Sequence, residues 1–171
     1  MESYRDAGLT GKGQICGVAD SGLNDLSCFF VDTSNKYSTI TTNRSGVLEP
    51  LRRKVIQYTS FADSFDDLGV PNSRSLMIPS SSYQNECKGG HGTHVCGSIA
   101  GASVSEFSSM NGMAPEAKLA FFDLGMTDRS FLKVPALIDI FQSAYDAGAR
   151  VHSNSWGNLG YVVLLRLFVM S

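Results

Sequence analysis

The chain has 171 residues, of which 43% are hydrophobic and 18% are charged, and its formal net charge at pH 7 is −2. These values are typical of one soluble globular domain. Because the chain lacks the basic excess that attracts polyanions, we expect neither a nucleic-acid partner nor a membrane partner.

The first twelve residues do not resemble a signal peptide, because they lack an apolar core between a basic end and a small-residue cleavage site. We expect the chain to begin inside a domain. The four cysteines are too few for a disulfide scaffold and do not settle the compartment. Cys16 and Cys96 lie in apolar runs and are predicted to be buried thiols, whereas Cys28 and Cys87 lie in loop-like stretches and could form a bridge.

The first predicted strand ends at an acid. Residues 14–19 form a short, nearly continuous apolar run after a glycine-rich turn, which predicts a strand buried on both faces of a parallel sheet. Asp20 follows directly. Sites in open α/β sheets form at the carboxyl ends of strands, so Asp20 is a candidate functional acid. The alternative is a turn cap, since an Asp before Ser-Gly is common in loops.

Residues 31–88 read as polar loops around one predicted strand at residues 55–59. The basic triplet at residues 52–54 is interpreted as a solvated strand entrance. Asp63, Asp66 and Asp67 form an acidic cluster that could hold calcium or be simply solvated. The ligand spacing of a dedicated calcium loop is absent, so no metal is assigned.

The stretch from Gly89 to Gly101 predicts a buried helix that begins near His91. Each interior glycine costs a helix about 1 kcal/mol relative to alanine, so the small residues need another explanation. We expect them to allow close packing against a sheet or another helix. The small residues are Gly92, Gly97, Ala100 and Gly101.

The remaining pattern alternates between strands and a helix. Residues 118–124 and 151–155 read as buried strands, and residues 134–147 read as an amphipathic helix with Pro135 near its start and Gly148 after its end. This order predicts a βαβ unit. The fold class is therefore α/β, a doubly wound parallel sheet with helices on both faces.

Three motifs resemble the subtilisin-like serine proteases, the subtilases. His-Gly-Thr-His-Val-Cys-Gly-Ser-Ile-Ala-Gly from His91 is similar to the family's histidine segment, and Val-Ala-Asp-Ser-Gly around Asp20 to its aspartate segment. Ser155-Trp156-Gly157 resembles its Ser-x-Gly segment; the alternative is a turn capped by a core Trp. The motifs stand in the family's order.

The resemblance implies a serine endopeptidase that hydrolyses peptide bonds with an Asp-His-Ser triad. Asp20 would orient His91, and His91 would act as general base. Ser155, Trp156 and Gly157 would bind a polypeptide substrate by strand addition. No cofactor is implied, although subtilases often carry structural calcium.

The sequence departs from the family pattern in two respects. No Gly-Thr-Ser-Met-Ala-type nucleophile segment occurs, and the later oxyanion-hole asparagine is also missing, so the chain as written is expected to be inactive. Residues 1–158 correspond to the N-terminal part of a peptidase domain, which makes the predicted sheet incomplete. The apolar tail at residues 159–171 does not continue the family pattern. Our hypothesis is a truncation artefact, and the alternative is one buried strand.

Two alternatives come from other classes. A non-catalytic subtilase fold could act as a binding module. Cys87, His91, His94 and Cys96 have the spacing C-x3-H-x2-H-x-C and could bind zinc, although structural zinc ligands usually have wider spacings.

Overall fold

A computed structural model describes residues 2–33, 42–43, 46–61, 90–126, 129–132, 134–156 and 168–169. The larger sheet has the strand order β2-β3-β4-β1-β7-β8. Its first five strands are parallel, and β8 runs antiparallel to β7. The elements are α1 (Glu2–Asp6), β1 (Ile15–Asp20), β2 (Thr42–Asn43), β3 (Val55–Ser60), α2 (His91–Ala100), η2 (Phe107–Met110), β4 (Lys118–Asp123), β5 (Gly125–Met126), β6 (Arg129–Leu132), α3 (Leu137–Asp146), β7 (Val151–Asn154) and β8 (Phe168–Val169).

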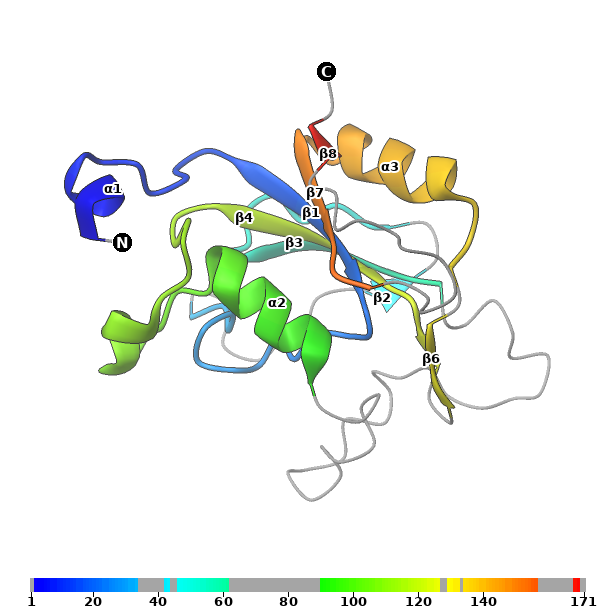
Figure 1. Ribbon diagram of the computed structural model, residues 1–171, viewed down its shortest axis with the longest axis horizontal. Coiled ribbons are helices and arrows are strands. Elements are labelled where there is room, and N and C mark those ends of the chain that lie inside the picture. The colour runs from blue at the N-terminus through cyan, green and yellow to red at the C-terminus, as the bar shows by residue number, and fades with distance from the viewer. Residues whose placement is uncertain are drawn as a thin grey trace.

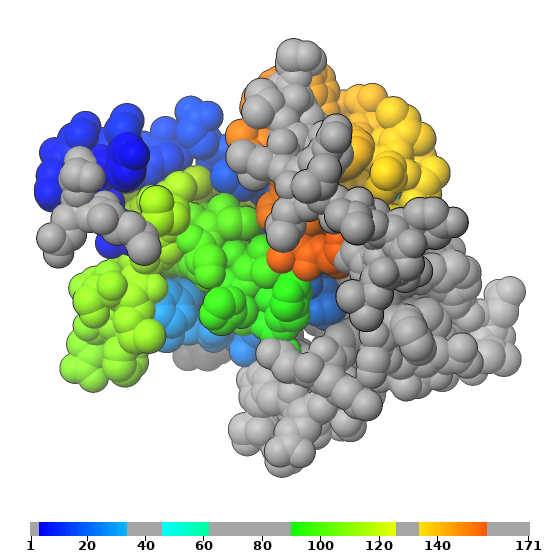
Figure 2. Space-filling model, viewed as in Figure 1, coloured from blue at the N-terminus to red at the C-terminus, as the bar shows by residue number. Residues whose placement is uncertain are grey.

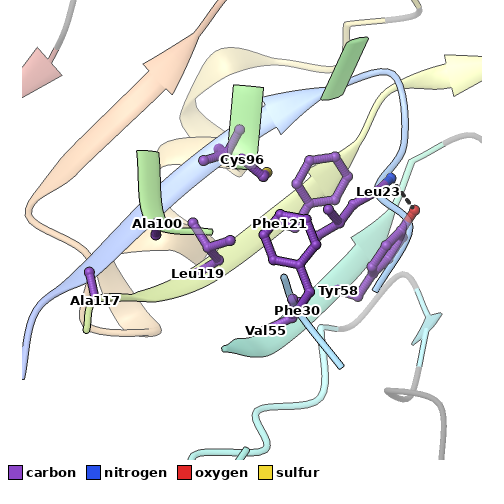
Figure 3. Packing of buried hydrophobic residues seen from close by; sticks show 10 residues of the cluster. Leu23, Phe30, Val55, Tyr58, Cys96, Ala100, Ala117, Leu119 and Phe121 are labelled. Carbon is purple, nitrogen blue, oxygen red and sulfur yellow. Dashed lines mark hydrogen bonds between the residues drawn. The ribbon is translucent and has the colours of Figure 1, made fainter. Parts of the chain in front are cut away.

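Helices cover both faces of the sheet, as the sequence predicts (Figure 1). Alternate residues of β4 point to opposite faces. Leu119 and Phe121 pack in a cluster with residues of α2, whereas Ala120 and Phe122 pack in a second cluster with residues of α3. Figure 3 shows the first cluster from close by. The architecture is therefore a parallel α/β sheet between helical layers.

Strand β1 is one of the two middle strands of this sheet and pairs with β4 on one side and with β7 on the other. The predicted βαβ unit of β4, α3 and β7 is present, but its two strands are not neighbours, since β1 lies between them. This insertion places the end of β1 at the middle of the sheet's carboxyl edge, with a strand on each side.

Helix α3 begins at Leu137, three residues later than the predicted start. Pro135 disfavours a helical conformation for Val134, the residue before it. Ala136 is the N-cap residue and has the non-helical ψ of 127°, so the helix begins after it. The predicted glycine after the helix is confirmed. Gly148 has φ of 96°, and the N–H groups of Gly148 and Ala149 donate to Tyr145 O and Ala144 O, a Schellman ending.

The basic triplet is a correction to the sequence analysis. Arg52 and Lys54 are buried, at 9% and 2% exposure, and are not solvated. Nζ of Lys54 donates to Pro115 O at 2.9 Å and to Ala117 O. Burial lowers the pKa of Lys54 to about 8.

Arg53 is partly buried and also donates hydrogen bonds to protein groups. Its guanidinium donates to the carbonyl oxygens of Val31, Ala102 and Phe29 at 2.9, 2.9 and 3.2 Å. Its backbone N–H donates to Asp32. The triplet therefore ties the start of β3 to the surrounding loops.

The segment after α2 lies beside the helix on the surface (Figure 2). Backbone N–H groups of Gly112, Met113 and Ala114 donate to carbonyls near the helix end. A Cβ on Gly112 would lie 2.4 Å from Gly97 O, which makes this contact tight. Gly97 itself is a correction, because a Cβ there would meet nothing within 4 Å.

Candidate active site

The candidate site begins with a buried carboxylate. Asp20 is the last residue of β1 and is 0% exposed. Its Oδ1 accepts a hydrogen bond from Ser21 N–H at 2.7 Å. Oδ2 is also buried and has no hydrogen-bond partner among the described residues. Hydrogen bonds therefore hold one oxygen of this carboxylate, while the other has no donor among the described residues.

The imidazole comes from the first residue of a helix. Gly90 precedes α2 in a left-handed conformation, with φ of 64°, that favours glycine, and its carbonyl accepts from His94 N–H at 2.9 Å. This turn aims the chain so that His91 opens the helix. The His91 side chain is 54% exposed, in contrast to the 1% of the Asp20 side chain.

The structure brings the two side chains together. Nδ1 of His91 lies 2.8 Å from Oδ1 of Asp20. Opposite an ionised carboxylate, which only accepts hydrogen bonds, Nδ1 is the donor of this pair. In a neutral ring this leaves Nε2 without a proton, as the nitrogen that can accept one.

Close approach of α2 to the turn after β1 requires a residue without a side chain. A Cβ on Gly92 would lie 2.3 Å from Gly22 O and 3.1 Å from Asp20 Cβ. The neighbouring Thr93 accepts a hydrogen bond from Asn24 N–H at 2.9 Å. The predicted role of small residues in close packing is therefore confirmed at Gly92.

Cys96 lies in the core under the pair and is 0% exposed. Burial, with a smaller contribution from the Asp20 charge, raises the pKa of its thiol well above the usual range. The thiol is therefore neutral and packs as a small apolar side chain. Cys16 and Cys28 are free thiols as well, but Cys16 is only partly buried, in contrast to the prediction.

The Ser-x-Gly segment follows β7 beside the same edge. Ala19 pairs with Asn154, so Ser155 follows at the level of Asp20 on the neighbouring strand. The indole Nε1 of Trp156 donates to Ala19 O at 2.9 Å, and its ring packs against the second cluster. Gly157 lies outside the described residues.

The zinc alternative receives no support from the described part of the chain, where no three potential ligands are grouped. His94 is exposed, whereas Cys96 is buried in the core, so the two cannot share an ion. Cys87 lies outside the described residues, as do Asp63, Asp66 and Asp67 of the calcium hypothesis.

Sequence reasoning missed Asp123. This residue ends β4, is 0% exposed, and stands in register with Asp20. Tyr58 Oη donates to its Oδ2 at 2.8 Å, and Gly125 N–H donates to its Oδ1 at 2.9 Å. The signal was present, because an acid after a buried strand is the same pattern that identified Asp20.

The fold and the site define a class: a parallel α/β domain with a carboxylate–imidazole pair at the carboxyl edge of a central strand. The family model described as "Subtilase family" matches residues 11–164. The chain belongs to the subtilase family, whose members are serine peptidases.

Comparison with curated proteins gives relatives in Dictyostelium discoideum. The chain is 38% identical over 161 residues to "Serine protease/ABC transporter B family protein tagD" and 36% identical over 157 residues to the protein of the same description, tagB. Each match covers 90% of this chain and 7% of the relative, so the chain spans a small part of their length. Among the described residues, no helix is long and apolar enough to cross a membrane.

Proposed function

We propose that this chain contributes the Asp-His half of a serine endopeptidase site, with Asp20 as the orienting acid and His91 as the general base. The contact of 2.8 Å between Nδ1 of His91 and Oδ1 of Asp20 carries the proposal. Family membership supports the reaction class, which is peptide-bond hydrolysis.

In the proposed mechanism, Asp20 holds the proton on Nδ1 and so keeps Nε2 as the proton acceptor. Nε2 takes the proton of a serine hydroxyl as that oxygen attacks the scissile carbonyl, and later returns it to the leaving amine. The imidazolium that forms is stabilised by the buried Asp20 carboxylate. Burial strengthens this interaction, because little water lies around the acid to screen it.

The proposed substrate is a polypeptide in extended conformation. It would pair with the backbone of Ser155, Trp156 and Gly157, adding a strand beside the segment that follows β7. Backbone hydrogen bonds of this kind hold many sequences equally well. The anchoring of Trp156 to Ala19 would keep that segment in line with β1.

The 171 residues contain no family-type nucleophile segment, so by themselves they are expected not to hydrolyse peptides. In subtilisin, loss of the nucleophilic serine lowers turnover by about a million-fold. A fluorophosphonate probe tests this directly. Labelling of the 171-residue chain would reveal a nucleophile elsewhere in it and contradict the expectation.

A chimaera tests the proposed roles. The chain replaces the matched 161-residue segment of the tagD protein, and cleavage of a fluorogenic peptide is measured. We expect Asp20→Asn and His91→Ala to reduce kcat/KM by at least about a thousand-fold. His94→Ala is the matched control, because His94 is exposed on the same helix. Activity that survives both substitutions would contradict the proposal. A chimaera that folds but never cleaves would favour a non-catalytic binding module.

A further inference from the structure

We propose that Asp123 is a positioning residue for the Asp20–His91 pair: a second buried carboxylate that acts on the imidazole through Asp20. The inference rests on the proposed function, which it extends to a residue outside the three motifs. Four observations support it. Asp123 is in register with Asp20, both acids are buried, a chain of hydrogen bonds leads to Asp123, and Oδ2 of Asp20 has no donor among the described residues.

The register places two acids side by side. Asp20 and Asp123 are paired across the parallel strands β1 and β4. Val18 and Phe121, two residues earlier on these strands, both pack in the first cluster. Side chains two positions apart share a face, so both acids point to the side of the sheet that α2 covers. Neighbouring strands are about 4.8 Å apart, which makes this a close pair.

The hydrogen bonds around Asp123 have a fixed direction. Leu23 N–H donates to Tyr58 Oη at 3.3 Å (Figure 3). Tyr58 Oη in turn donates to Asp123 Oδ2 at 2.8 Å. Gly125 N–H donates to the other oxygen. Donors at both oxygens favour the ionised form of a carboxylate. We propose that these two donors keep Asp123 ionised beside Asp20, against the burial and like-charge repulsion that favour its neutral form.

This series of hydrogen bonds also reaches the turn after β1, which orients Asp20. Leu23 follows Ser21, which donates to Asp20, and Gly22, against which Gly92 of α2 packs. Tyr58 thus ties this turn to β3 and β4. Two contributions to the Asp20–His91 pair can therefore be tested separately. Tyr58 links the turn to the sheet, and Asp123 supplies negative charge.

The charge has a direct consequence for the imidazole. A second buried anion adds negative potential at the pair, and Asp20 Oδ2 has no donor among the described residues to offset it. Negative potential favours the protonated ring. In the proposed reaction it would stabilise the imidazolium that forms as the nucleophile attacks.

The test follows the ring signals of the three histidines by NMR over a pH series in the 171-residue chain. We expect Asp123→Asn to lower the pH at which the His91 ring gains its proton by about half a unit or more. His94 serves as the internal control and should not move. Tyr58→Phe keeps the charge but removes the tie, so it should produce less than half of the Asp123→Asn change.

An unchanged His91 midpoint in Asp123→Asn would overturn the inference, as would an equal change in Tyr58→Phe, which would show a purely structural role. Should Asp123→Asn not fold, Asp123→Glu retains the charge and should leave the midpoint near that of the parent; a drop there would also overturn it. Asp20→Asn tests the proposed function separately. It should lower the midpoint by about one unit or more, and no change would contradict the Asp20–His91 pair itself.

Discussion

At the scale of single residues, the contact between Asp20 and His91 depends on Gly92. Because Gly92 has no Cβ, the start of α2 can lie directly against Gly22 O. The motif predicted a small residue at this position. It could not predict that Gly22 O is the atom it contacts, because only the fold brings Gly22 and Gly92 together.

Gly92→Ala is expected to lower the free energy of unfolding by about 1–3 kcal/mol, since the new methyl group would overlap backbone that cannot move freely. Gly97→Ala is the matched control on the same helix. Its Cβ would meet open space, so the gain in helix propensity should stabilise the chain by up to about 1 kcal/mol. Urea denaturation measures both. Equal effects at the two positions would contradict the close-approach explanation.

His152 makes a second residue-scale prediction. The ring is 0% exposed and lies against Phe122 and Phe141. Burial lowers its pKa from 6.5 to about 4. Between these values the unfolded chain binds a proton that the folded chain does not, so stability should fall as the pH drops from about 6.5 to about 4.

The loss attributable to His152 should be on the order of 3 kcal/mol at most, measured as the difference from His152→Gln, which does not titrate. Denaturation at a series of pH values provides the measurement. Identical acid profiles for the parent and the variant would show that His152 does not set the acid limit.

At the scale of elements, periodicity predicted the long strands and the two longer helices, because each has a continuous apolar pattern. The ends shifted by one to three residues for local reasons, such as Pro135 before α3. The two-residue strands β2 and β5 were not predicted, since two residues carry no periodicity. The burial of Lys54 was also missed, because the sequence before a strand does not indicate whether buried carbonyl groups will accept hydrogen bonds from a lysine there.

The stability of the β3 region should depend on pH through Lys54. Burial lowers its pKa from 10.5 to about 8, so between these values the unfolded chain binds the extra proton. Stability should therefore rise as the pH increases from about 8 to about 10.5. Lys54→Met should remove this rise, as measured by denaturation at pH 8, 9 and 10. An unchanged slope in the variant would mean that Lys54 is effectively solvated in the folded chain.

At the scale of the whole molecule, what the sequence could not supply was strand order. It placed Asp20 and Asp123 at the ends of two buried strands, but β3 lies between those strands along the chain. Only the observed order, with β4 beside β1, makes the acids neighbours. The aspartate and histidine motifs predicted a contact between Asp20 and His91, and the structure shows it. The hydrogen-bonded surroundings of Asp20 come from long-range pairing that no local pattern encodes.

The unequal exposure of the two partners has a dynamic consequence. Asp20 ends a strand that is paired on both sides, whereas His91 sits at a helix terminus with half its surface in water. Exposed side chains change rotamer in picoseconds to nanoseconds, while release of a central strand requires opening of the sheet. Asp20 therefore stays in place while the His91 ring can change rotamer. The imidazole can leave and regain the carboxylate many times while the surrounding strands and helices stay unchanged.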